Sequence, residues 1–133
     1  MRVLLLIFAV GLHTQVHADW DAAEPFKAKC SKGTMSEMND CLAAEWRKLD
    51  GQLNESYRVL LAELVDGRSL RSAQRSWMVF RDNECDYAVS GLERGGSLYP
   101  YALHSCRIDL TVKRLKDMDR HLAEKCNGCP PRK

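Results

Sequence analysis

The sequence lacks features that several broad classes of protein need. Its longest apolar run covers residues 3–12, which is too short to span a bilayer as a helix. Its 20 basic residues nearly balance its 18 acidic residues, so it lacks the basic surface typical of nucleic-acid-binding domains. It has no low-complexity tract, and 45% of its 133 residues are hydrophobic, which argues against disorder. These properties leave one small folded domain.

The sequence also has few residues suited to catalysis. Two of its four histidines lie near the N-terminus, and the other two are His104 and His121. Motifs typical of serine hydrolases, zinc peptidases, nucleotide-binding loops and dinucleotide-binding folds are missing. Most carboxylates lie among lysines and arginines on expected helix surfaces. We therefore predict a protein that is not an enzyme and that needs no catalytic residue, cofactor or metal ion.

The first residues of the chain have the pattern of a secretory signal peptide. A basic residue, Arg2, precedes the apolar run, and Val16-His17-Ala18 places small residues at the first and third positions before a cut. Cleavage after Ala18 would leave 115 residues with a net charge of +1. No cysteine directly follows the apolar run, so we expect a soluble periplasmic or secreted protein without a lipid anchor. The alternative is an N-terminal membrane anchor.

Six cysteines are many for a chain of this length. An even number of cysteines in a small exported domain favours disulfides over free thiols or zinc ligands. All six follow the expected cleavage site: Cys30, Cys41, Cys85, Cys106, Cys126 and Cys129.

Apolar residues recur at steps of three and four, which predicts an all-α fold with three long helices. The first helix begins after Thr34, which forms a capping box with Glu37, and it ends before residues 66–67. The second follows a Ser69 cap and fades at residues 90–91. The third has Pro100 in its first turn and ends before residue 127.

The second helix carries the most distinctive part of the sequence. We expect its buried face to be formed by Leu70, Ala73, Trp77 and Phe80, followed by Glu84 or Cys85 and then Ala88. Arg81 lies one turn beyond Trp77, where it would form a structural ion pair with a carboxylate of the first or third helix. The alternative is that Arg81 binds a partner.

Three helices with short connections fit an antiparallel bundle, and this geometry suggests how the cysteines pair. Cys85 near the end of the second helix would face Cys106 near the start of the third. Cys30 would join Cys41 across the start of the first helix. The domain would then comprise a lead-in at residues 19–29, a helical domain at 30–122 and a tail at 123–133.

The remaining pair, Cys126 and Cys129, lies in the tail as a C-x-x-C motif. A redox dithiol normally lies at a helix N-terminus, where the helix dipole stabilises a thiolate, whereas this motif follows a helix C-terminus. A zinc site using both sulfurs and His121 lacks an obvious fourth ligand. A local structural disulfide is the favoured interpretation, with redox activity and metal binding as the alternatives.

An ordered series of residues extends over most of the chain. It comprises Cys30, Cys41, Leu53, Asn54, Tyr57, Leu70, Gln74, Trp77, Arg81, Asp82, Cys85, Gly95, Gly96, Ser97, Cys106, Thr111, Arg114 and Leu115. This series resembles the LprI-type lysozyme inhibitor domain, a family of small exported bacterial proteins. The resemblance implies a helical, disulfide-bonded, exported domain with lysozyme as its partner. It supplies no catalytic residues, and it does not include the tail cysteines.

A lysozyme inhibitor must block a cleft that contains two carboxylates, and a rigid loop does so at low entropic cost. The best candidate is the glycine-rich connection before the third helix, where Glu93, Arg94, Ser97 and Tyr99 are the expected contact residues. The alternative is a solvent loop whose glycines only make the turn. For the protein as a whole, we expect a monomer. The alternative function is a periplasmic binding or immunity module for another envelope partner.

Overall fold

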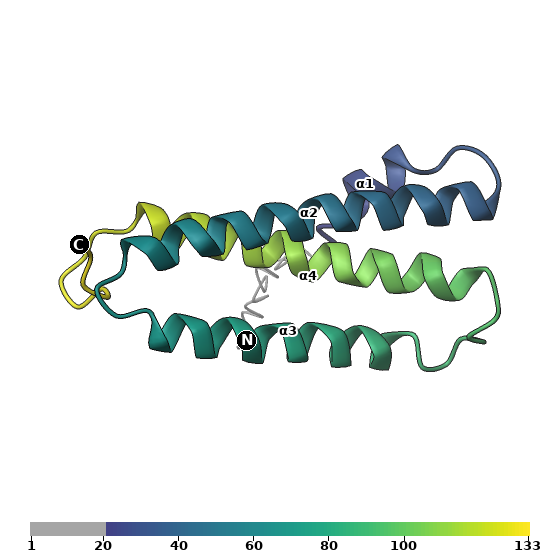
Figure 1. Ribbon diagram of the computed structural model, residues 1–133. Coiled ribbons are helices and arrows are strands. Elements are labelled where there is room, and N and C mark those ends of the chain that lie inside the picture. The colour runs from purple at the N-terminus through teal and green to yellow at the C-terminus, as the bar shows by residue number, and fades with distance from the viewer. Residues whose placement is uncertain (1–20) are drawn as a thin grey trace, which may run out of the picture.

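A computed structural model describes residues 21–133, which form a bundle of helices (Figure 1). The chain order is α1 (Glu24–Lys29), α2 (Met35–Glu63), α3 (Arg68–Ala88) and α4 (Leu98–Ala123). The three long helices run up, down and up, so α2 and α4 are parallel and α3 is antiparallel to both (Figure 1). This arrangement confirms the all-α, antiparallel, disulfide-stapled fold expected from the sequence.

Helix α2 begins at the capping box that the sequence predicts. The Thr34 hydroxyl accepts a hydrogen bond from the Glu37 backbone N–H at 3.3 Å. The Glu37 carboxylate in turn accepts from the Thr34 backbone N–H at 2.7 Å. The reciprocal bonds satisfy donors that the first helical turn would otherwise leave unpaired.

The hydrophobic core lies mainly between α2 and α4. Buried residues at heptad-like spacings on α2 face Ile108 and Met118 of α4, and both of these side chains are fully buried. Two core clusters follow the bundle axis; together their buried residues are Ala23, Cys30, Leu42, Leu49, Ile108, Leu53, Leu60 and Met118.

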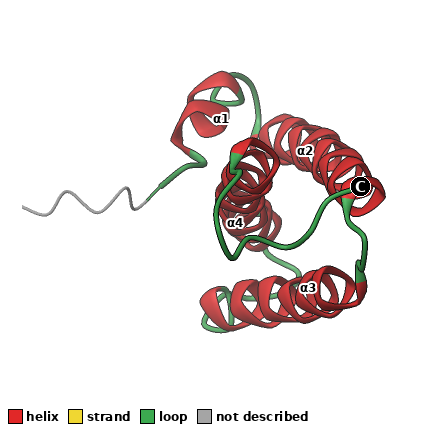
Figure 2. Ribbon diagram, turned by 90° about the vertical axis from the view of Figure 1, so that its left-hand side faces the viewer, coloured by secondary structure: helices red, strands yellow, loops and turns green. Residues whose placement is uncertain are grey.

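The segment expected as a lead-in contributes the short helix α1, which lies beside α2 and α4 on the side away from α3 (Figure 2). Ala23 before this helix is fully buried in the core. The Ala22 backbone N–H donates to the Asp109 carboxylate of α4 at 2.7 Å. This part of the chain is therefore packed onto the bundle.

The expected buried face of α3 is partly wrong. The buried residues of α3 are Gln74, Arg81 and Cys85, whereas Phe80 is 51% exposed. The Cys85 disulfide and Trp77 fix the rotation of the helix, and positions 74, 77, 81 and 85 then share its inner face at helical spacing. Two of these positions are polar, so hydrophobicity alone pointed to the neighbouring face.

The expected start of α3 is also corrected. Its N-cap is Gly67, and Ser69 lies inside the helix without capping it. The Asp66 carboxylate instead accepts from the Arg68 backbone N–H at 2.9 Å. Asp66 therefore satisfies the free backbone N–H of the first helical residue.

Three disulfides join the cysteine pairs that the sequence predicts. Cys30–Cys41 and Cys85–Cys106 each have Cα atoms 5.6 Å apart, and Cys126–Cys129 has them 5.1 Å apart. Each longer bridge adds on the order of 2–4 kcal/mol by restricting the unfolded chain.

The expected signal peptide, residues 1–18, lies outside the described residues. Between residues 21 and 133, no helix is both long and apolar enough to cross a bilayer.

Candidate functional site

The connection between α3 and α4 lies at one end of the bundle, at the right of Figure 1. It spans residues 89–97 and is closed by short backbone hydrogen bonds. The Gly96 N–H donates to the Glu93 carbonyl at 2.9 Å, and the Tyr99 N–H donates to the Gly96 carbonyl at 3.2 Å. The connection is therefore an ordered turn that leads directly into α4.

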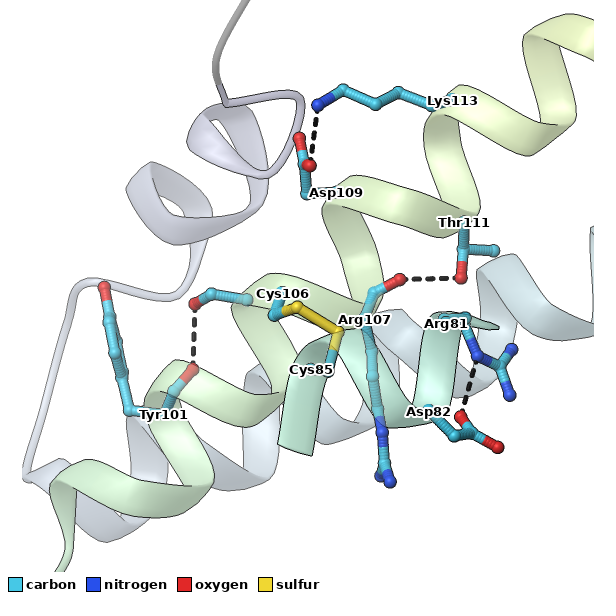
Figure 3. Close-up of a disulfide and its surroundings, with 10 residues drawn as sticks. Arg81, Asp82, Cys85, Tyr101, Cys106, Arg107, Asp109, Thr111 and Lys113 are labelled. Carbon is cyan, nitrogen blue, oxygen red and sulfur yellow. Dashed lines mark hydrogen bonds and ion pairs between the residues drawn. A yellow bond between two sulfur atoms is a disulfide. The ribbon is translucent and has the colours of Figure 1, made fainter. Parts of the chain in front are cut away.

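Three contacts fix this loop to the bundle. Val89 at its start is only 2% exposed. The Cys85–Cys106 disulfide joins the two helices just below it, as Figure 3 shows. The Asn39 side-chain amide of α2 donates to the Ser97 carbonyl at 2.9 Å. These three contacts hold the loop backbone in one conformation before any partner binds.

The adjacent glycines Gly95 and Gly96 of the loop have different surroundings. Neither has a positive φ, since Gly33 and Gly128 are the positive-φ glycines of the described residues. A Cβ on Gly95 would meet nothing within 4 Å, whereas a Cβ on Gly96 would lie 3.1 Å from the Glu93 carbonyl oxygen. Close backbone approach therefore favours glycine at position 96 alone.

The expected contact residues lie together on this loop. Glu93, Arg94 and Ser97 are exposed, and Tyr99 is half-buried in the first turn of α4. Arg94 makes no ion pair with any residue in the described part of the chain. Its guanidinium is therefore free to meet an acidic group of a partner.

Arg81 forms the structural ion pair that the sequence predicts as its main role. Its side chain is 8% exposed and donates to Asp50 of α2 at 2.8 Å and to Asp82 at 3.0 Å. Asn54, four residues after Asp50, donates to the same Asp50 carboxylate at 3.3 Å. The link between Asn54, Asp50 and Arg81 joins α2 to α3.

Two tryptophans alternate with three arginines between α2, α3 and α4, and we call this set the arginine–tryptophan stack. The Arg81 guanidinium carbon lies 5.6 Å from the Trp46 ring centre and 5.3 Å from that of Trp77. Arg107 extends the stack at the Trp46 end, at 4.8 Å, and Arg114 extends it at the Trp77 end, at 5.7 Å. Each contact is a cation–π interaction.

Buried Gln74 binds the outer end of this stack. Its carbonyl accepts from the Arg114 Nε at 3.1 Å. Burial lowers the pKa of Arg114, although the nearby Asp117 carboxylate opposes this effect. The motif residues Gln74, Trp77 and Arg81 thus share one role, which is to position α3 against α2 and α4.

Sequence reasoning missed Trp46, Asp50 and Arg107 as members of this network. Helical spacing offered a signal, since Trp46 and Asp50 lie four residues apart on α2, and Arg107 and Arg114 lie seven apart on α4. The network lies between the three long helices, whereas the candidate contact residues lie at one end of the bundle. Tyr57 and Trp77 both pack against the core cluster around Leu53.

The opposite end of the bundle carries the C-terminal tail, which crosses from α4 to the end of α2 (Figure 2). The Val65 N–H donates to the Pro131 carbonyl at 3.0 Å, and Arg132 pairs with Glu63. The tail borders a mainly apolar cavity of about 430 Å³. Its lining includes Leu60, Leu64, Leu70, Ala73, His121, Cys126, Cys129, Pro130 and Arg132.

Both tail cysteines are disulfide-bonded, and His121 lines the cavity beside them. Across residues 21–133, no group of three or more histidine, cysteine, aspartate or glutamate side chains is arranged to hold a metal ion.

Comparison with known proteins gives a family match that covers most of the described chain. The family model described as "Lysozyme inhibitor LprI" matches residues 27–118. The chain is also 31% identical over 106 residues to "Uncharacterized protein R02472" of Rhizobium meliloti (strain 1021), over 67% of this chain and 75% of that protein. No solved structure matches.

Proposed function

Since the chain belongs to the LprI family of lysozyme inhibitors, we propose that it binds lysozyme and blocks the substrate cleft with its α3–α4 loop. The observation that carries this proposal is an exposed arginine without an ion pair, Arg94, on a loop that is anchored at both ends.

The chemistry of the target explains why Arg94 is the central residue. Lysozyme cleaves glycosidic bonds with a pair of carboxylic side chains that flank the scissile bond. A guanidinium placed between them forms charge-assisted hydrogen bonds, which are stronger than neutral ones. Ser97 and Glu93 add exposed polar contacts, and Tyr99 adds apolar area at the base of the loop.

The order of the loop supports the same proposal. Binding by a flexible loop costs about 0.5–1.5 kcal/mol for each side chain that becomes fixed. Here the Asn39–Ser97 hydrogen bond and the Cys85–Cys106 bridge hold the backbone before a partner arrives. The mature net charge of +1 gives little long-range attraction, so affinity would come from these local contacts.

In this proposal the protein acts as a monomer outside the cytoplasm, in the periplasm or after secretion. Export fits the N-terminal pattern of residues 1–18 and the three disulfides, which are stable in an oxidising compartment.

The test is a lysis assay in which the oxidised protein, residues 19–133, is added to a peptidoglycan suspension with lysozyme. We expect slower lysis, and we expect Arg94→Glu to weaken inhibition at least tenfold because one good charge-assisted contact contributes about 1.5–3 kcal/mol. Circular dichroism and the melting temperature should stay unchanged, since Arg94 has no partner within the described chain.

Arg75→Glu is the matched control, because it makes the same charge change at an exposed position of α3 that also lacks an ion pair. It lies about 20 Å from the loop along the helix. Equal loss of inhibition in both variants would contradict loop occlusion. No inhibition at high molar excess, across several lysozyme types, would contradict the function itself and favour another envelope partner.

A further inference from the structure

The Arg107 end of the arginine–tryptophan stack has an unusual hydrogen-bonding state. Arg107 is half-buried, and its guanidinium carbon lies 4.8 Å from the Trp46 ring centre. Its Nε is buried without a hydrogen-bond partner, and its terminal nitrogens donate no hydrogen bond within residues 21–133. Stacking therefore holds a guanidinium whose five N–H donors are all unused by the described chain.

Two further buried nitrogens without partners lie beside it. Trp46 Nε1 is a donor, and His104 Nδ1 becomes one when protonated. The His104 and Trp46 rings are stacked with their centres 6.0 Å apart. Buried polar atoms normally find partners, so three unpaired nitrogens around one indole ring are unexpected for a purely structural cluster.

Neither Arg107 nor Arg47 forms an ion pair within residues 21–133. Burial lowers the pKa of His104, and the positive charges of Arg107 and Arg47 lower it further. The two carboxylates that contact the stack, Asp50 and Asp82, both pair with Arg81. Figure 3 shows the Arg107 side chain extending past the Cys85–Cys106 bond with no hydrogen bond or ion pair to Asp82.

We propose that Trp46, His104 and Arg107 form a binding site for a small oxyanion, either a carboxylate or a phosphate group. The flat guanidinium fits two oxygens of such a group side by side. The indole N–H and a protonated His104 supply further donors, and Arg47 adds positive charge at the rim. The site is separate from the α3–α4 loop and does not depend on lysozyme inhibition.

The site can be tested by NMR on the full oxidised protein, using inorganic phosphate and acetate as separate probes at constant ionic strength. The Trp46 indole N–H signal is assigned with Trp46→Phe. We expect the chemical shift of this signal to change saturably with one or both probes. A titration with sodium chloride at the same ionic strength serves as the control. A response to phosphate alone or to acetate alone identifies which oxyanion the site prefers.

Bound anion must also raise the pKa of His104, because it stabilises the imidazolium form. A saturable probe that leaves the His104 titration unchanged would contradict this part of the site. The histidine therefore gives a second readout that a remote binding event would not move.

Arg107→Gln should weaken the affinity about tenfold or more, since it removes the paired charge-assisted contacts. Arg107→Lys keeps the positive charge but loses the paired N–H donors of the guanidinium, so its affinity should lie between that of the parent and that of Arg107→Gln. Arg75→Gln is the control at an exposed arginine of α3 without an ion pair, and it should bind as the parent does.

No saturable shift with either probe, or the same shift with chloride, would overturn the site. Equal loss of binding in Arg75→Gln and Arg107→Gln would do so too, because only general charge would then matter. Melting curves of each variant separate lost binding from lost folding.

Discussion

Replacing Arg81 by methionine tests whether a buried guanidinium holds α3 in place. Arg81 is the most buried charged residue of α3, with 7% of its surface exposed. It pairs with Asp50 and Asp82, and it stacks on two tryptophans. Methionine has a similar length and keeps the apolar packing, so the variant removes the charge and the hydrogen bonds without opening a large cavity.

The expected cost follows from these contacts. Breaking a fully buried ion pair costs about 3–5 kcal/mol. The Asp50 and Asp82 side chains are 35% and 49% exposed, so water can solvate their carboxylates when Arg81 is removed. The cost of leaving these carboxylates unpaired is therefore smaller than for a fully buried pair. The two cation–π contacts add about 0.5–1 kcal/mol each, which methionine recovers in part. We therefore expect a loss of about 2–3 kcal/mol in the free energy of unfolding.

The measurement is reversible urea unfolding with the disulfides intact, supported by thermal melting. A loss of this size corresponds to a fall of about 10 °C in the melting temperature of a domain of this length. Arg75→Met is the control on an exposed face of the same helix, and it should stay within about 0.5 kcal/mol of the parent. Asp50→Asn should cost less than Arg81→Met, because an amide oxygen still accepts from Arg81.

The double variant decides whether the pair acts as a unit. If Arg81 stabilises through Asp50, the costs of Arg81→Met and Asp50→Asn should add to more than the cost of the double variant. Additive costs, or an Arg81→Met variant no less stable than Arg75→Met, would refute the reasoning.

Two further predictions concern the loop and pH. Gly96→Ala should destabilise the fold by about 1 kcal/mol because its Cβ would crowd the Glu93 carbonyl, whereas Gly95→Ala should be neutral or slightly stabilising; urea unfolding of both variants checks this, and equal effects would contradict it. Burial, Arg107 and Arg47 lower the pKa of His104 from its usual value of 6.5. The stability that neutral His104 provides should therefore be fully present above pH 6.5, and the free energy of unfolding should fall as the pH drops below that value. His104→Gln should flatten this dependence in unfolding curves, and an unchanged slope would contradict it.

Much of the fold could be predicted because its signals are local. The Thr34–Glu37 capping box lies within four residues and needs no tertiary information. The cysteine pairing followed once the second and third long helices were taken as antiparallel, because that places Cys85 opposite Cys106. Both inferences depend on short-range geometry that every amphipathic helix shares.

The inner face of α3 could not be predicted in the same way. Hydrophobicity favoured Phe80, but Arg81 is buried and Phe80 is exposed. A buried arginine is stable only when carboxylates and aromatic rings from other helices surround it. Those partners, Asp50 and Trp46, lie more than 30 positions earlier in the chain. The sequence therefore suggested an ion pair for Arg81 but could not identify the residues that form it.

The same contrast separates the two candidate sites. The exposure of Arg94 could be predicted from the sequence because residues next to paired glycines in a surface loop are usually exposed. Arg107 could not be identified in this way, because the relevant observation is that its buried Nε has no hydrogen-bond partner within the described chain. Arg81 and Arg107 contact the same Trp46 ring, yet Arg81 is matched by two carboxylates and Arg107 by none. Stacking alone therefore does not neutralise a guanidinium. Within the stack, Arg107 has no carboxylate partner, and an anion from outside the chain would bind most favourably there.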